Sequence, residues 1–285
     1  IYSINTLVDK SIALNLADGK VSGLNYGYNT YASVATTIIL GISTVLYPKF
    51  IETRILNSKE EFKKQITDVL KIMTYIALPL MVCFLVLSKE IIEIAYMRNS
   101  FTEYSVELTS WSLFFYALGT LSYTFQEMML KVFYSLKESK IPMITSIITV
   151  VINIALDFAL VKTPLEYKGL ALATTIAITV NAIVLFVLLE KRFGSLEKRK
   201  ICMTFVKSLA SLILPVISTR LIISKMYVTG ASLLTNLGVL LLAILVAGIL
   251  YLIVSYILKM DETNYIFTEL IKIKKERIGV KNEKE

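Results

Sequence analysis

Histidine is absent from this chain of 285 residues. Its absence excludes catalytic triads built on histidine, H-E-x-x-H zinc sites and histidine proton relays. Cysteine occurs only twice, as Cys83 inside one apolar stretch and Cys202 at the start of another. This spacing predicts neither a metal site nor a disulfide framework, so we interpret both cysteines as small buried hydrophobic residues.

Charge is also scarce. Asp, Glu, Lys and Arg make up 18% of the residues, whereas 55% are hydrophobic and the mean hydropathy is +0.67. This composition is typical of an integral membrane protein. The net charge of +8 would also suit a nucleic-acid-binding protein. The basic residues, however, lie in short connectors between apolar runs, so we expect no nucleic-acid partner.

Long apolar segments dominate the chain. A transmembrane helix needs about 20 mostly apolar residues. About eight segments approach this length: 1–16, 21–47, 66–87, 105–133, 141–161, 169–189, 203–224 and 232–258. We expect the first to be incomplete, because the chain opens inside it. Lipid offers the backbone no hydrogen-bond partners, so the sequence predicts an all-α integral membrane protein.

Basic residues alternate between the connectors. One set of connectors, 49–64, 131–140, 191–200 and 259–284, holds twenty lysines and arginines. The alternate set holds seven, at position 20 and within 89–98, 162–168 and 220–225. Connectors rich in Lys and Arg remain in the cytoplasm. The pattern therefore predicts that the C-terminus is cytoplasmic.

Two connecting segments are amphipathic. Residues 49–65 predict either an element lying along the membrane surface or a solvated loop. The tail, 265–285, has apolar residues at near-helical spacing before a basic end, which predicts an interfacial helix.

Polar side chains inside the apolar segments need an explanation, because they are costly in lipid. Asn153 and Asp157 are four residues apart, and Asn5 and Asp9 repeat that spacing in the first segment. Residues at this spacing share one face of a helix, and their hard oxygen atoms suit Na⁺, Mg²⁺ or Ca²⁺. A hydrogen-bonded cluster between helices, or an ion pair between Asp157 and Lys10, explains them equally well.

Four stretches resemble one family in their order along the chain: INTLVDKSIALNLADGKVSGLNYGYNTY, GISTVLYPKF, FYSLKESKIPMITSIITVVINIALDFALV and YKGLALATTIAITVNAIVLFVLL. They are similar to the lipid II flippases of the MurJ/MviN type, within the superfamily of multidrug, oligosaccharidyl-lipid and polysaccharide exporters. The resemblance implies a transporter of 14 helices, with two lobes of six helices and two extra helices. This chain would hold helices 7–14: the second lobe in 1–194, the two extra helices in 195–258, and a basic cytoplasmic tail in 259–285.

The resemblance also implies a cation site in the second lobe. Family members bind Na⁺ through an Asp on helix seven, an Asn-x-x-x-Asp pair on helix eleven, and a Thr with a nearby carbonyl on helix twelve. The matching residues are Asp9, Asn153, Asp157 and Thr174, with Leu170 as the carbonyl donor. We therefore expect Na⁺ as the coupling ion and no other cofactor.

The stretch after the "LNY" motif differs from the family pattern. Family members often carry an acidic or amide residue followed by Arg at the positions of Tyr28 and Asn29, and that Arg faces the central cavity. A neutral amide can donate a hydrogen bond but cannot neutralise a phosphate. We expect Asn25, Tyr26, Asn29 and Tyr31 to face the cavity and contact the substrate headgroup.

We therefore predict part of a flippase for lipid-linked saccharides, most simply the undecaprenyl-linked lipid II. It would work by alternating access in the bacterial inner membrane, in contact with membrane lipid and as a monomer in the full-length form. An exporter of another polysaccharide-lipid would tolerate Asn29 more readily. An integral membrane enzyme is a third possibility, but Glu90, Glu93 and Glu103 in one predicted outer loop are better interpreted as a solvated face. A membrane scaffold would leave Asn153 and Asp157 unexplained.

Overall fold

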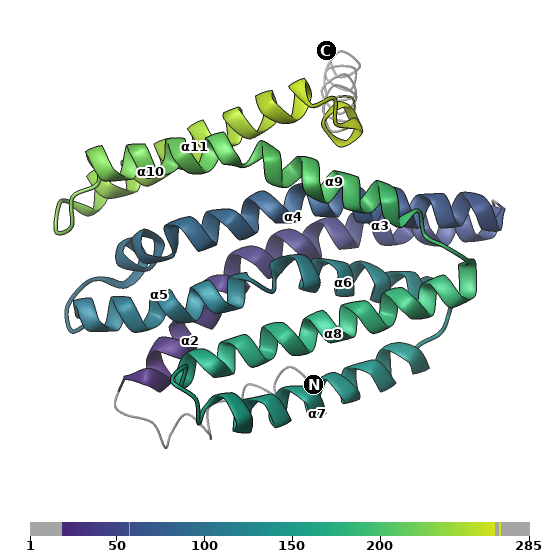
Figure 1. The fold of residues 1–285 in the computed structure, drawn as a ribbon, viewed down its shortest axis with the longest axis horizontal. Coiled ribbons are helices and arrows are strands. Elements are labelled where there is room, and N and C mark those ends of the chain that lie inside the picture. The colour runs from purple at the N-terminus through teal and green to yellow at the C-terminus, as the bar shows by residue number, and fades with distance from the viewer. Residues whose placement is uncertain (1–18, 57, 266–267, 269–285) are drawn as a thin grey trace, which may run out of the picture.

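The fold is described from a computed structural model, which covers residues 19–56, 58–265 and 268. Every regular element in this part of the chain is helical (Figure 1). The elements are α2 (Lys20–Tyr31), the π-helical turn η1 (Ala32–Thr36), α3 (Thr37–Leu56), α4 (Lys59–Tyr96), α5 (Glu103–Ala117), α6 (Thr120–Ser135), α7 (Lys140–Leu160), α8 (Tyr167–Phe193), α9 (Lys198–Ser211), α10 (Ile213–Met226) and α11 (Leu233–Ile257).

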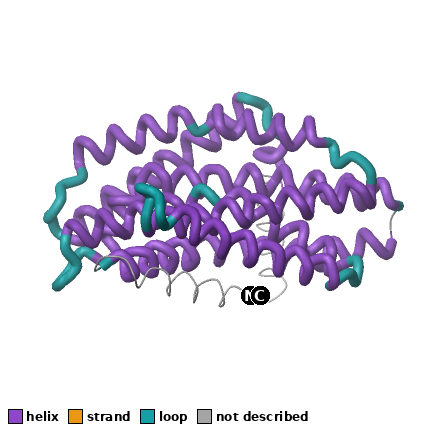
Figure 2. Tube along the Cα trace, turned by 60° about the horizontal axis from the view of Figure 1, so that its bottom comes forward, coloured by secondary structure: helices purple, strands orange, loops and turns teal. Residues whose placement is uncertain are grey.

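Six helical stretches of the described chain are long and apolar enough to cross a membrane. They are 20–53, 59–96, 140–160, 167–193, 198–226 and 233–257. Each overlaps one predicted segment, so the all-α membrane fold is confirmed. The first predicted segment, 1–16, lies outside the described residues. The helices run mostly side by side, with loops at the two ends of the bundle and further short breaks between them (Figure 2).

Two predicted segments are broken into pairs of helices. The segment 105–133 divides at Leu118–Gly119 into α5 and α6, where the Thr120 hydroxyl donates to the Ala117 carbonyl at 2.7 Å. The segment 203–224 divides at Leu212 into α9 and α10. Pro215 explains the second break, because proline lacks the N–H that would bond to the Ser211 carbonyl and its ring crowds that carbonyl.

Residues 49–65 form neither a surface element nor a solvated loop. α3 continues to Leu56 and α4 begins at Lys59, so the two helices meet in a short hairpin. Ser58 and Glu61 form a capping box at the start of α4, which satisfies free N–H groups there. Phe50 and Phe62 are buried and lie 6.3 Å apart between ring centroids. Phe50 and Phe62 therefore pack against each other within the hairpin.

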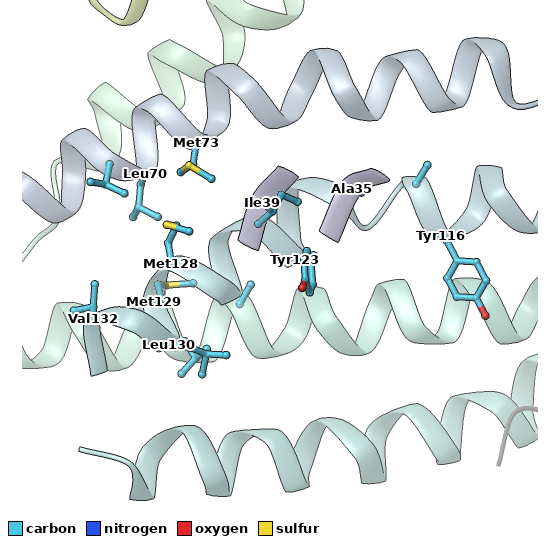
Figure 3. Close-up of a cluster of buried hydrophobic side chains, with 14 of the residues drawn as sticks. Ala35, Ile39, Leu70, Met73, Tyr116, Tyr123, Met128, Met129, Leu130 and Val132 are labelled. Atoms are coloured by element: carbon cyan, nitrogen blue, oxygen red, sulfur yellow. The ribbon is translucent and has the colours of Figure 1, made fainter. Parts of the chain in front are cut away.

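The largest hydrophobic core extends from α2 to α9 and includes the place where α3, α4 and α6 meet. Ile39 from α3, Leu70 and Met73 from α4, and Met128 and Met129 from α6 are all at most 2% exposed (Figure 3). Methionine fills irregular gaps because its unbranched side chain adapts to its neighbours. This part of the core packs against the N-terminal half of α4, the longest of the described helices.

The residues after α11 pack back onto the bundle. Glu262 is 4% exposed; its Oε1 lies 2.8 Å from the hydroxyl of Thr204 in α9 and 3.2 Å from the Lys71 amine in α4. Thr263 is also buried, and its hydroxyl lies 3.2 Å from the Tyr75 hydroxyl. The start of the predicted tail is therefore part of the folded bundle, while residues 266–285, apart from Thr268, lie outside the described residues.

Candidate functional site

The buried face of α7 is polar. Pro142, Thr145, Asn153 and Asp157 are its buried residues, and the last two are completely inaccessible to solvent. The opposite face exposes large apolar side chains such as Ile148, Val151 and Phe158. A polar buried face and an apolar exposed face are typical of a helix with lipid on one side, because its polar groups must point into the bundle.

α8 brings two more oxygen atoms to this face. The Asn153 amide nitrogen lies 3.5 Å from the Thr174 hydroxyl, which in turn donates to the Leu170 carbonyl at 3.2 Å. Gly169 permits the close approach, because a Cβ there would lie 2.9 Å from the Leu160 carbonyl oxygen. The structure therefore brings Asn153, Thr174 and Leu170 together, with Asp157 one turn from Asn153 on the same face of α7.

The oxygen donors of this cluster suit a hard cation. They comprise an amide, a carboxylate, a hydroxyl and a backbone carbonyl, the ligand types of Na⁺, Mg²⁺ and Ca²⁺. Asn153 Oδ1 is buried and accepts no hydrogen bond in the part of the chain that the structure describes. An oxygen in that state is suited to a ligand, because a buried acceptor without a partner is costly.

Asp9, Asn5 and Lys10 lie outside the described residues. The predicted ion pair between Asp157 and Lys10 therefore involves a residue outside the described part of the chain. Among the described residues, no group of three Asp, Glu or Cys side chains is placed to hold a metal. The α7–α8 cluster has a single carboxylate, which suits a monovalent ion better than a transition metal.

The predicted headgroup residues lie on α2. Asn29 is exposed, Tyr26 is 41% exposed and Asn25 is half-buried. Ser22 and Ser33 are also exposed at helical spacing from Tyr26 and Asn29. We call Ser22, Tyr26 and Asn29 of α2, together with Ser33 of η1, the α2 polar surface.

Tyr31 differs from this expectation. It is 5% exposed and packs between Phe84 of α4 and Tyr116 of α5, with ring centroids 6.2 and 6.3 Å away. Two residues after Asn29, a helix has turned by more than half a revolution, so the side chain points into the bundle. The prediction that Tyr31 faces an open cavity is wrong for this conformation.

Two further expectations are corrected. Glu90 and Glu93 do not belong to a solvated loop; they lie in the last turns of α4 and are 8% and 7% exposed. Glu90 is 3.5 Å from the Arg220 guanidinium of α10. Cys202 is exposed, and Cys83 is only partly buried, so the interpretation of both cysteines as buried is wrong for Cys202.

An apolar cavity that sequence reasoning did not locate lies between α4, α10 and α11. Its volume is about 320 Å³, and its walls include Pro79, Val216, Gly248 and Tyr251. Pro215 and Gly248 line this cavity, but single prolines and glycines are common in membrane helices and did not indicate it in the sequence.

Comparison with known proteins identifies the family. The model of the family "Lipid II flippase MurJ" matches residues 1–238. A probable lipid II flippase MurJ of Vibrio cholerae is 28% identical over 186 residues, 65% of this chain and 35% of that protein. The corresponding protein of Bdellovibrio bacteriovorus is 23% identical over 269 residues, 93% of this chain and 50% of that protein.

The fold agrees with this result. A solved structure of lipid II flippase MurJ in an inward closed conformation has a TM-score of 0.70 at 24% identity, covering 86% of this chain and 50% of that chain. The chain thus spans half or less of the length of these relatives. On the match over residues 1–238 and the helical bundle described above, this chain belongs to the lipid II flippase MurJ family.

Proposed function

We propose that this chain forms part of a flippase that moves lipid II, an undecaprenyl-linked saccharide, across the bacterial inner membrane. The whole protein would act by alternating access, with Na⁺ or the membrane potential biasing the two conformations. The buried oxygen cluster of Asn153, Asp157, Thr174 and Leu170 supports the Na⁺ coupling. Membership of the MurJ family supports the substrate.

The cluster would act by tying helices together. Asp157 and Asn153 come from α7, Thr174 and Leu170 from α8, and the resemblance adds Asp9 from the segment before α2. A cation held by all of them would favour the conformation in which these helices are close, since a ligand shifts an equilibrium towards the state that binds it better. The Asp157 carboxylate would attract the cation, because opposite charges interact more strongly in a low-dielectric interior than in water.

The headgroup and the lipid tail would contact different surfaces. The α2 polar surface offers an amide at Asn29 and a phenol at Tyr26, both of which donate hydrogen bonds to saccharide or phosphate oxygens. The apolar cavity between α4, α10 and α11 would accept part of the isoprenoid tail, because its walls are almost entirely hydrocarbon. Tyr31 is omitted from this surface because it is buried.

Sodium-dependent stability of the full-length protein tests the cation site. In detergent, NaCl should raise the midpoint of thermal unfolding above that in equal KCl, and Asp157→Asn should abolish the difference. The matched control is Glu60→Gln, which removes an exposed carboxylate in the first turn of α4. This variant should retain the Na⁺ effect. Equal midpoints in both salts for the unmodified protein, or a full Na⁺ effect in Asp157→Asn, would show that the site is not a sodium site.

Asn29 favours a second candidate substrate, another lipid-linked polysaccharide. The exposed Asn29 stands where related flippases carry Arg, and it lacks the charge that neutralises a pyrophosphate. An exporter of another lipid-linked polysaccharide would need that charge less. Depletion of the protein in cells, followed by labelling of lipid carriers on each side of the membrane, separates the two. Accumulation of lipid II on the cytoplasmic side of the membrane supports the first proposal. Accumulation of a different lipid carrier, with lipid II distributed as in undepleted cells, supports the second.

A further inference from the structure

A second cavity lies at the end of the bundle where α4 turns into α5. Its volume is about 840 Å³, and its walls come from the last turns of α4, most of the length of α5, Arg220 of α10 and Thr229 in the connector after α10. It shares no residue with the oxygen cluster, the α2 polar surface or the apolar cavity described above. The proposed function therefore leaves it unused.

The cavity changes from apolar to charged along the helices. Leu85 of α4 and Phe114 of α5 form the end that lies deeper in the bundle. Glu93 and Glu103 line it near the α4–α5 connector, two or three turns away from those residues. Two turns of helix span roughly 11 Å, comparable with the depth over which a lipid passes from acyl chain to headgroup. An amphiphile lying parallel to the helices would match this gradient.

The charged end has opposite charges on different walls. Lys89 of α4 and Arg220 of α10 are cationic, whereas Glu103 and Glu107 of α5 are anionic. The Arg220 guanidinium also lies 3.5 Å from Glu90, but 56% of its side chain remains exposed. Glu103 and Glu107 are four residues apart and exposed, so both carboxylates can meet a ligand from the same face of α5. Glu93, which is 7% exposed, adds a buried carboxylate to the same cavity.

Aromatic rings form the wall between the two ends. Trp111 is 40% exposed, and the Lys168 amine lies 4.6 Å from the centroid of its ring, which holds the indole in place. Tyr104 stands nearer the charged end and is 55% exposed. Tryptophan and tyrosine are enriched at the level of lipid headgroups, because one part of each ring system is apolar and another is polar.

We propose that this cavity binds a phospholipid whose headgroup carries both a phosphate and a primary amine, as in phosphatidylethanolamine. The phosphate would lie against Lys89 and Arg220, and the ammonium against Glu103 and Glu107. The upper part of one acyl chain would pass Trp111 towards Leu85 and Phe114. The site would hold this lipid as a structural ligand at the edge of the bundle.

The charges also predict which lipids bind weakly. A primary ammonium donates hydrogen bonds to carboxylates, and charge-assisted bonds are roughly twice as strong as neutral ones. A choline group has no N–H to donate, so it loses those bonds. A phosphatidylglycerol headgroup has no cation, and its net negative charge meets the carboxylates of α5. The expected order is therefore ethanolamine above choline, with glycerol lowest.

The single tryptophan of this chain reports directly on occupancy, because it lines the cavity. The full-length protein is reconstituted in phosphatidylcholine vesicles, and lipids brominated on the upper acyl chain replace part of the host lipid. Bromine quenches indole fluorescence only at close range. A matched Trp111→Phe variant gives the fluorescence of any tryptophan elsewhere in the full-length protein. This signal is subtracted from that of the unmodified protein. Brominated phosphatidylethanolamine should reach half-maximal quenching at a mole fraction about five-fold lower than brominated phosphatidylcholine or phosphatidylglycerol.

Charge removal tests the recognition itself. Glu103→Gln with Glu107→Gln preserves side-chain shape at two exposed positions and should reduce the ethanolamine preference to within about two-fold. Glu60→Gln at the other end of α4 is the matched control and should retain the preference. Equal quenching by all three headgroups in the unmodified protein, or an unchanged preference in the double variant, would overturn the proposal. The sodium effect on thermal stability should persist in the double variant, so the two proposals can fail separately.

Discussion

Asn181 is the clearest buried polar side chain without a partner in the described part of the chain. It is 3% exposed in α8, and neither its amide nitrogen nor its oxygen makes a hydrogen bond there. An amide in that state carries a desolvation cost of about 1–3 kcal/mol. Asn236 of α11 is equally buried, but its amide bonds to the Val228 backbone, with the nitrogen 2.9 Å from the carbonyl oxygen.

These two asparagines make a matched pair. Asn181→Leu should leave the thermal midpoint of the full-length protein unchanged or raise it, because leucine has a similar volume and no polar group to desolvate. Asn236→Leu should lower it, because the Val228 backbone groups would lose their partner. Thermal unfolding in detergent measures both. A fall for Asn181→Leu as large as that for Asn236→Leu would indicate that the native protein supplies Asn181 with a partner, such as a water or a transported ligand.

Helix pairs in this bundle are brought together by glycine. Gly23 and Gly27 of α2 are four residues apart and face α5; a Cβ at Gly27 would lie 2.5 Å from the Ser112 Cβ and 2.9 Å from the Leu113 backbone nitrogen. Small residues at this spacing permit close helix contact in membranes. The G-x-x-x-G pattern could have predicted the contact from the sequence, but nothing in the sequence indicated that α5 is the partner.

Gly27→Ala should therefore separate α2 from α5. The contacted atoms include backbone, which cannot move aside, so overpacking should cost about 1–3 kcal/mol. Gly238 of α11 is the control, because no atom lies within 4 Å of a Cβ built there. Gly238→Ala should be neutral or slightly stabilising. Thermal unfolding compares the two variants, and equal midpoints would mean that α2 and α5 are less tightly packed in the membrane.

In the described part of the chain, the connectors at one end of the bundle carry more basic residues than those at the other end. The α3–α4, α6–α7 and α8–α9 connectors lie together, opposite the α4–α5, α7–α8 and α10–α11 connectors (Figure 1). The first set carries the Lys-rich stretches, together with ion pairs between Arg192 and Glu138 and between Lys198 and Glu190. Basic connectors on one side are retained in the cytoplasm.

The orientation can be measured on intact cells. Green fluorescent protein fused after Glu285 should fluoresce, and alkaline phosphatase at the same position should be inactive, if the C-terminus is cytoplasmic. A phosphatase fusion placed at Ser100, in the α4–α5 connector, should be active as the matched control. Activity at Glu285 without activity at Ser100 would reverse the predicted orientation.

Much of the helical architecture could be predicted from local sequence patterns. Apolar length, lipid's lack of hydrogen-bond partners and alternating charge predicted the helices and their order, and i,i+4 spacing placed Asn153 and Asp157 on one face. The α5–α6 break and the merging of residues 49–65 into two helices escaped this reasoning. They depend on packing against other helices, as at Gly119, where a Cβ would lie 3.0 Å from the Thr175 hydroxyl.

The candidate sites also include features that the sequence predicted and features that only the tertiary structure revealed. The sequence by itself determined the membrane fold, the buried polar pair on α7 and the family, because each depends on residues that are near in the chain or on the order of motifs. Only the tertiary structure decided that Thr174 meets Asn153, that Tyr31 is buried, and that Glu93 and Glu103 line one cavity with Trp111. These facts depend on which helix faces which, and helices that are equally apolar on their outer faces carry little local information about their neighbours.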